Sequence, residues 1–321
     1  MMKKQTKQRG LSLVELMVAM LISLFLTAGL FTMFSMSSSN VTTTSQFNQL
    51  QENGRIALAI MERDLSQLGF MGDITGTDFI IGSNTTISST AVAADCVGAG
   101  LNNASFPNAQ PSHFRRLWGY EQGVSAESLA CITPNSKTDV IQIKRLIGPP
   151  ANVLTSTRYY AATVFNEIVF FNGSAGAPGL ANSRLWEYQH HVYFISDDGN
   201  VPVLRRRTLS INNGMNNEEQ LVEGIENMRI LYGFDSNGDG TADSYMPSQN
   251  VTTLMWDNEQ FQRLVALRVF LLVRSSEEDR SYKNVNKYKL GDKTIGPLND
   301  NYRRKVVSST IVLENPILIN T

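Results

Sequence analysis

The feature that most constrains this chain is a long apolar run close to its N-terminus. Residues 11–34 contain a single charged side chain, that of Glu15. A helix of this length, at about 1.5 Å per residue, reaches about 36 Å and can cross a hydrocarbon core of about 30 Å. The run therefore predicts a transmembrane helix, and the rest of the chain must fold as a separate part.

The charges around the run indicate which side of a membrane each part occupies. Basic residues cluster before it, at Lys3, Lys4, Lys7 and Arg9, and the next one along the chain is Arg55. Because positively charged flanks stay in the cytoplasm, we expect residues 1–9 to be cytoplasmic and the remainder to be exported.

Glu15 discriminates between interpretations of the run. A secretory signal peptide has a shorter apolar region, of about 7–15 residues, with a small-residue cleavage site after it. A plain signal anchor fits the length but has no use for a carboxylate, which costs about 2.5–3.5 kcal/mol at the middle of a membrane. An ionisable side chain in such a segment is a candidate functional group and needs a partner.

A third interpretation supplies that partner. The sequence GLSLVEL at 10–16, behind a basic leader, resembles the type III leader of type IV pilins and pseudopilins. The resemblance implies cleavage after Gly10 by a prepilin peptidase, N-methylation of the new terminus Leu11, and an assembly role for Glu15. In that role the carboxylate meets the N-terminal amine of a neighbouring subunit, which makes a buried charge tolerable. The chain departs from the family in having Leu11 where Phe is usual and no proline before Pro107.

Residues 35–72 are predicted to continue the helix in amphipathic form. Residues 35–45 are rich in Ser and Thr, which are weak helix formers, so we expect the helix to loosen there. Apolar or small residues then recur every three or four positions, at Phe47, Leu50, Gly54, Ala57, Met61, Leu65 and Leu68. We predict a helix over 11–69 with this stripe packed on the chain's own sheet, and a contact with a second subunit is the alternative.

Residues 73–321 have the pattern of a β-rich periplasmic or extracellular domain. Alternating and β-branched segments predict strands at 139–147, 163–171, 191–207, 227–235, 264–275 and 308–315, with a hairpin turn at 196–200. A further strand, tight turn and strand are expected within 214–232. After residue 70 helical periodicity is weak, with one candidate turn at 126–130. The predicted fold class is α+β and pilin-like, with a long N-terminal helix packed on an antiparallel sheet.

The two cysteines, Cys96 and Cys131, lie in a loop-rich segment at 83–136. In an oxidising compartment they would pair and close a loop of about 36 residues, which is worth about 4 kcal/mol on the chain-entropy model. Two unrelated buried thiols are the alternative. The pairing would staple 83–136 as an insertion, and such loop-built surfaces often contact partners.

Several later segments extend the resemblance. The stretches 54–70, 221–235, 268–275 and 303–315 resemble minor pilins of the PilW type and, more distantly, J-type minor pseudopilins of type II secretion. This implies a low-copy, non-enzymatic subunit that joins other minor pilins, primes type IV pilus assembly and sits at or near the tip. The implied partners are the major pilin, the other minor pilins, the prepilin peptidase, the inner membrane and a PilY-type tip adhesin. A secretion pseudopilin and a membrane-anchored periplasmic enzyme or binding module are the alternatives.

One polar loop has the spacing of a calcium site. Oxygen-bearing residues follow the first nine positions of a calcium-binding loop, at Asp235, Asn237, Asp239, Thr241 and Asp243. The closing Glu at the twelfth position is absent, because Met246 stands there. The candidate is thus a shortened Ca²⁺ loop between strands. A polar turn without metal is the alternative, since Asp, Asn and Gly tolerate turn conformations.

Other chemistry has little support in the sequence. The histidines are His113, His190 and His191, and the last two should face opposite sides of a strand. No nucleotide-binding or nucleophile-elbow motif occurs. Net charge is −1 with a pI near 6.3, so nucleic acid is not expected as a partner. The cluster at 205–207 is interpreted as a solvated strand end rather than a DNA contact.

Overall fold

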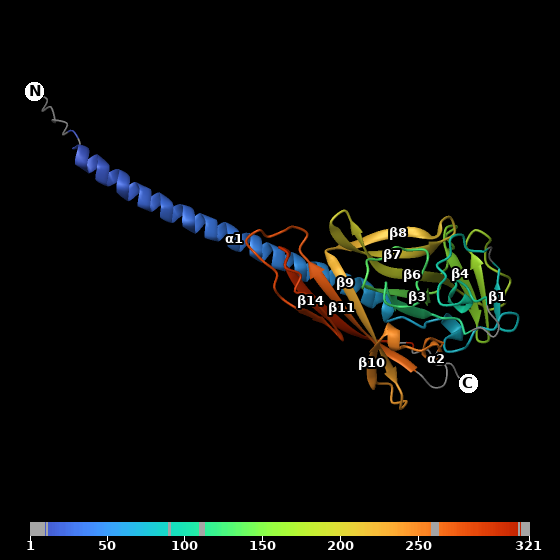
Figure 1. Cartoon of the computed structure of the whole chain (residues 1–321). Coiled ribbons are helices and arrows are strands. Elements are labelled where there is room, and N and C mark those ends of the chain that lie inside the picture. The colour runs from blue at the N-terminus through green and yellow to red at the C-terminus, as the bar shows by residue number, and fades with distance from the viewer. Residues whose placement is uncertain are drawn as a thin grey trace, which may run out of the picture. The chain divides into compact units, whose positions relative to one another are not determined.

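The computed structural model of this chain describes residues 10, 12–88, 91–108, 113–257, 263–313 and 315. It divides into two units, residues 1–49 and residues 50–321. Helix α1 spans Leu13–Leu65 and thus contributes to both. Figure 1 labels most of the helices and strands, and each unit is described by itself.

Helix α1 begins after Ser12 and is unbroken through residues 35–45, so the predicted loosening is wrong. In this region Thr42 Oγ1 donates to the Ser38 carbonyl one turn earlier, at 3.1 Å. Such bonds satisfy the side chains without opening the helix. The helix ends at Leu65, four residues before the predicted end. The following turns reach Gly69, whose φ of 83° only glycine adopts easily.

The larger sheet of the second unit has eight strands, of which β6 is the longest. Its strands are β1 (Thr85–Ile87), β2 (Leu117–Glu121), β3 (Asp139–Ile147), β4 (Tyr159–Val164), β5 (Glu167–Asn172), β6 (Arg184–Asp198), β7 (Val201–Ser210) and β8 (Gly214–Glu223). Strand β6 pairs along one edge with β3. Along the other it pairs first with β4 and then with β7, which β8 extends. All pairs are antiparallel except β1–β5.

A four-stranded antiparallel sheet follows in the chain, in the order β10-β9-β11-β14. Its strands are β9 (Ile225–Asp235), β10 (Ser244–Pro247), β11 (Arg263–Arg274) and β14 (Arg304–Val312). The short hairpin of β12 (Tyr288–Leu290) and β13 (Lys293–Ile295) precedes β14. Between β10 and β11 lie the turn η3 (Ser248–Asn250) and the short helix α2 (Thr253–Trp256).

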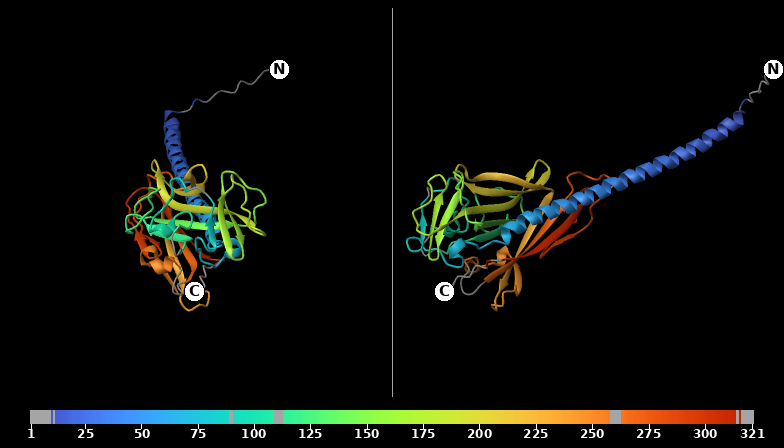
Figure 2. Two further views of the ribbon diagram at one scale, coloured as in Figure 1. Left: turned by 90° about the vertical axis from the view of Figure 1, so that its right-hand side faces the viewer. Right: turned by 180° about the vertical axis from the view of Figure 1, so that it is seen from behind.

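The end of α1 packs against both sheets and forms one core with them (Figure 2). The predicted stripe is buried from Leu50 onward, whereas Phe47 is 40% exposed. Gly54 marks the closest approach to a sheet, because a Cβ added there would lie 2.8 Å from Val307 of β14. The prediction that the stripe packs on the chain's own sheet is therefore confirmed for residues of the second unit.

The opposite face of the eight-stranded sheet has a second core, built with residues of the predicted insertion. Cys96, Phe106, Phe114 and Leu129 pack there with side chains of β3, β4, β5 and β6. The prediction that 83–136 is mainly loop missed β2, whose five residues are all buried. The short length of β2 hid it, since five residues offer little periodicity.

The α+β fold class with a long N-terminal helix is confirmed, and most strands lie where the pattern put them. One error is the segment 163–171, predicted as a single strand. It is a hairpin, because β4 ends at Val164 and β5 starts at Glu167. The turn contains Phe165, an aromatic residue that is typical of strands, and this residue hid the break although it is exposed. The candidate helical turn at 126–130 is also wrong, since no helix is assigned there.

Candidate functional site

The predicted cleavage site precedes α1 directly. Gly10 is exposed, and no atom of the described residues beyond its chain neighbours lies within 4 Å of where its Cβ would be. Leu11, the predicted site of N-methylation, lies outside the described residues. Both roles stay predictions.

Glu15 has a local partner that sequence reasoning missed. Its Oε2 accepts a hydrogen bond from the backbone N–H of Ser12 at 2.9 Å, and Ser12 Oγ accepts one from the N–H of Glu15 at 3.2 Å. This reciprocal pair is a capping box, and the spacing Ser-x-x-Glu could have predicted it. The carboxylate therefore starts the helix in the isolated chain. Its predicted contact with a neighbouring subunit would have to replace or share the bond from Ser12.

The apolar side chains around and after Glu15 are exposed in the described part of the chain. From Leu13 to Met36, the large apolar side chains are 49–77% exposed. By length and composition, α1 qualifies as a membrane span. An exposed apolar surface of this extent needs lipid or other apolar helices around it. This supports membrane anchoring through the N-terminal part of α1.

The disulfide predicted between Cys96 and Cys131 is present, with Cα atoms 5.2 Å apart. It lies in the second core, where Gln142 of β3 donates to the Cys96 carbonyl at 3.1 Å. The insertion is thus tied to itself by a covalent bond and to the sheet by polar contacts. Residues 83–136 do form a stapled segment, but one that covers the sheet.

His190 and His191 point to opposite faces of β6, as predicted. His190 lies 2.8 Å from Ser105 Oγ and 2.7 Å from Gln142 Nε2. Asp95 accepts from the same Ser105 hydroxyl at 2.6 Å. Acid and imidazole thus converge on one buried hydroxyl, whereas a hydrolase triad places them in series. This arrangement holds the insertion on the sheet.

On the other face of β6, His191 belongs to a buried cluster around Asp64 of α1. Asp64 accepts hydrogen bonds from Arg145 at 2.7 Å, from His191 at 2.6 Å and from the Tyr193 hydroxyl at 2.5 Å. Burial by itself raises the pKa of Asp64, but the bond and charge of His191, with Tyr193 and Arg145, outweigh it and lower that pKa. The ionised carboxylate locks the end of α1 to β3 and β6.

The arginines of 205–207 are not a solvated strand end, so that interpretation is wrong. Arg205 and Arg207 both pair with Glu218, at 2.8 and 3.1 Å, and Arg206 pairs with Glu219 at 2.7 Å. The partners lie on the neighbouring strand β8, in the register that sets β7 against it. Cross-strand pairing of opposite charges stabilises the sheet edge and leaves little free positive charge for a phosphate.

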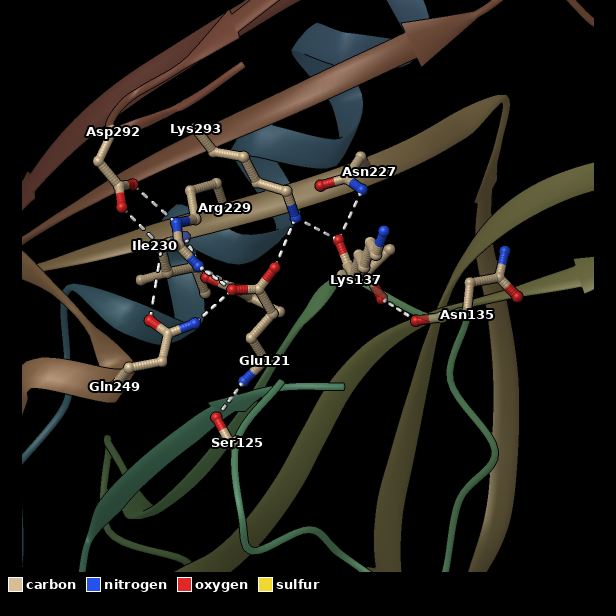
Figure 3. A network of polar contacts seen from close by, with 12 residues as sticks. Glu121, Ser125, Asn135, Lys137, Asn227, Arg229, Ile230, Gln249, Asp292 and Lys293 are labelled. Carbon is tan, nitrogen blue, oxygen red and sulfur yellow. Dashed lines mark hydrogen bonds and ion pairs between the residues drawn. The ribbon is translucent and has the colours of Figure 1, made fainter. Parts of the chain in front are cut away.

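A second buried charge network joins the two sheets (Figure 3). Arg229 of β9 pairs with Glu121 at 2.8 Å, with Asp139 at 3.1 Å and with Asp292 at 2.7 Å. Lys293 adds a bond to Glu121 at 2.7 Å. Burial raises the pKa of Asp139 to about 7, although Arg229 and the Ile230 N–H oppose the rise. The network fixes β9 and the β12–β13 hairpin against β2 and β3.

The candidate calcium loop joins β9 to β10. Asp235 accepts from the backbone N–H groups of Asn237, Gly238 and Gly240 at 2.6–3.1 Å. Asp239 accepts from Thr241, and the two Asp243 oxygens accept from Ser236 and Asn237. Within the described residues no three His, Cys, Asp or Glu side chains are grouped so as to hold a metal. The carboxylates thus order the loop's own backbone, and calcium binding stays a prediction.

The two ends of the chain match known families. Residues 192–315 match the family of Type IV Pilus-assembly protein W, and residues 5–31 match the prokaryotic N-terminal methylation motif. No match is found among curated proteins or among solved structures.

The two matched regions agree with the structure described above. A methylation motif before a capped, apolar helix, followed by antiparallel sheets, is consistent with a pilin-like fold. The match over residues 192–315 covers β9, β11 and β14 and confirms the resemblance to the PilW type over that region. Together they support a type IV pilus-related minor pilin that is anchored in a membrane by its N-terminal helix.

Proposed function

We propose that this protein is a low-copy minor pilin that joins other minor pilins to prime type IV pilus assembly and sits at or near the pilus tip. The observation that carries the proposal is the union of two parts in one chain. One is an exposed apolar helix behind a prepilin-type motif. The other is a domain in which the end of α1 shares a core with two larger sheets, while an insertion builds a further core on the eight-stranded sheet. The helix suits co-assembly with other pilins. The domain is larger than the repeated subunit of a fibre requires, which favours a low-copy subunit.

The physical reason for the tip is the symmetry of a fibre. A repeated subunit must offer the same contact surfaces to neighbours above and below it. A head enlarged by an insertion and a second sheet fits best where subunits lie on one side only. The tip of the fibre is such a place. A complex that primes assembly is made first, so it would end up at the tip.

The proposed function implies a membrane topology for the chain and a set of partners. Before assembly the chain spans the inner membrane with its N-terminus in the cytoplasm, where a prepilin peptidase cuts after Gly10. After assembly it lies in the fibre with other minor pilins, the major pilin and a PilY-type adhesin. It acts as a structural subunit without enzymatic activity, and the cluster of Asp95, Ser105 and His190 supports this, since its hydroxyl is buried.

Two measurements test the proposal. N-terminal mass spectrometry of the mature protein is expected to find methylated Leu11, and an intact Met1 would refute pilin processing. Deletion of the gene is expected to abolish surface pili and twitching, with recovery on complementation. Normal pili combined with lost protein secretion would instead identify a secretion pseudopilin.

A further inference from the structure

Lys144 of β3 is a buried amine that forms no ion pair within the described residues. Its side chain has 0% exposure, and three oxygens lie within hydrogen-bond distance of its Nζ: the Asn103 carbonyl at 2.9 Å, Asn103 Oδ1 at 3.0 Å and the Arg115 carbonyl at 3.0 Å. A neutral amine donates to two of these oxygens and keeps one lone pair. No carboxylate among the described residues forms an ion pair with it. A buried ammonium without a counter-charge is costly, so the neutral amine is favoured there.

The group facing Lys144 is the carboxamide of Asn103, in the turn η2 (Leu101–Asn103). Asn103 is also 0% exposed, and its Nδ2 donates to the Gly98 carbonyl at 2.9 Å. This second bond fixes the orientation of the amide, because only its nitrogen side can donate to Gly98. The carbonyl side is therefore held toward the amine of Lys144.

The surroundings favour a nucleophilic amine. Burial lowers the pKa of Lys144 well below its usual value, against a smaller opposing effect of the nearby Asp95 carboxylate. The Phe114 ring lies 4.8 Å from Nζ and helps to exclude water. A desolvated lysine is a good nucleophile. Two groups held in contact on packed elements also react with a high effective concentration.

We propose that Nζ of Lys144 and Cγ of Asn103 form an isopeptide bond in the folded protein. The amine lone pair attacks Cγ, and the bond from Cγ to Nδ2 breaks. The nitrogen leaves as ammonia and takes up the proton that the amine gives up, so no oxidant or reductant is needed.

This bond would give the insertion a second covalent tie. The disulfide between Cys96 and Cys131 closes the insertion on itself, whereas a bond from Asn103 to Lys144 joins it to the middle of the sheet. The second tie would also persist under reducing conditions. For a head carried on a pulled fibre, it would keep the second core closed under load.

The experiment is peptide mapping of the full-length protein after denaturation, reduction and alkylation. Trypsin cannot cut after an acylated lysine, so segment 138–145 is expected uncut and joined to segment 64–115, at a mass one ammonia below their sum. A free peptide ending at Lys144 in stoichiometric amount, without the joined pair, would overturn the proposal and identify a lysine that only hydrogen-bonds.

Matched variants sharpen the result without being needed for it. Lys144→Met removes the nucleophile and is expected to abolish the joined pair completely. Asn103→Asp keeps an attackable carbonyl, so a joined pair is expected whose mass is lower by water instead of ammonia.

Discussion

Asp64 of α1 and His191 of β6 share a buried hydrogen bond of 2.6 Å between Oδ2 and Nδ1. The same carboxylate takes a second bond, from the buried guanidinium of Arg145. The end of the helix is thus fixed to the sheet by a single charged side chain. Removal of one partner of a buried pair is expected to cost more than the pair itself contributes.

We therefore expect Asp64→Asn to lower the free energy of unfolding by about 3–5 kcal/mol, because it leaves the Arg145 charge buried without a counter-charge. Denaturant unfolding of the full chain in detergent, followed by near-UV circular dichroism, measures the change. Glu52→Gln on the same helix is the control, since the Glu52–Arg55 pair is exposed and its loss should have little effect. Equal effects of the two variants would contradict the anchoring role of Asp64.

The burial of Asp139 makes the stability of the folded protein depend on pH. Its pKa rises from 3.8 to about 7 in the folded state, mainly because of burial. The folded state therefore binds this proton more tightly than the unfolded state. The contribution of Asp139 to stability is largest at low pH and falls as the pH rises from about 4 to about 7.

In Asp139→Asn this dependence should vanish, because an amide does not titrate while its oxygen still accepts from the Ile230 N–H. The difference in melting temperature between wild type and variant is the measurement, taken across the same pH range. A difference that does not change with pH would show that Asp139 keeps its charge when buried.

The capping box allows the two roles of Glu15 to be separated. Glu15→Gln keeps an oxygen that accepts from the Ser12 N–H, so the start of the helix is preserved while the charge is lost. Ser12→Ala removes the capping hydroxyl and keeps the charge. We expect the Gln variant to be lost from sheared pili and the Ala variant to remain, as judged by immunoblotting. Incorporation of both at wild-type level would leave the charge of Glu15 without a role in assembly.

The loop at 235–243 makes a fourth prediction. If calcium binds there, it must draw the Asp235, Asp239 and Asp243 oxygens away from the backbone groups that they now accept from. Wild type should then melt at a higher temperature with calcium than with EDTA, and Asp239→Asn should remove the difference. An unchanged wild-type melting curve in EDTA would identify a polar turn.

Local patterns along the chain were enough to predict several parts of this protein. A long apolar run with one carboxylate specifies a membrane helix, and the glutamate spacing behind Gly10 specifies a pilin-type start. Strands such as 139–147 and 227–235 could be predicted from alternation alone. In each case neighbouring residues along the chain contain the information, because side chains repeat with the period of the backbone.

Contacts between residues far apart in the chain could be found only from the folded protein. The pairing of Asp64 with His191, the Arg229 network and the placement of Asn103 against Lys144 join segments separated by 127, 90 and 41 positions. Single positions such as these leave no periodic trace in the sequence. Their contacts arise because the insertion folds back over the sheet, and burial then turns ordinary charged side chains into anchors and a reactive pair.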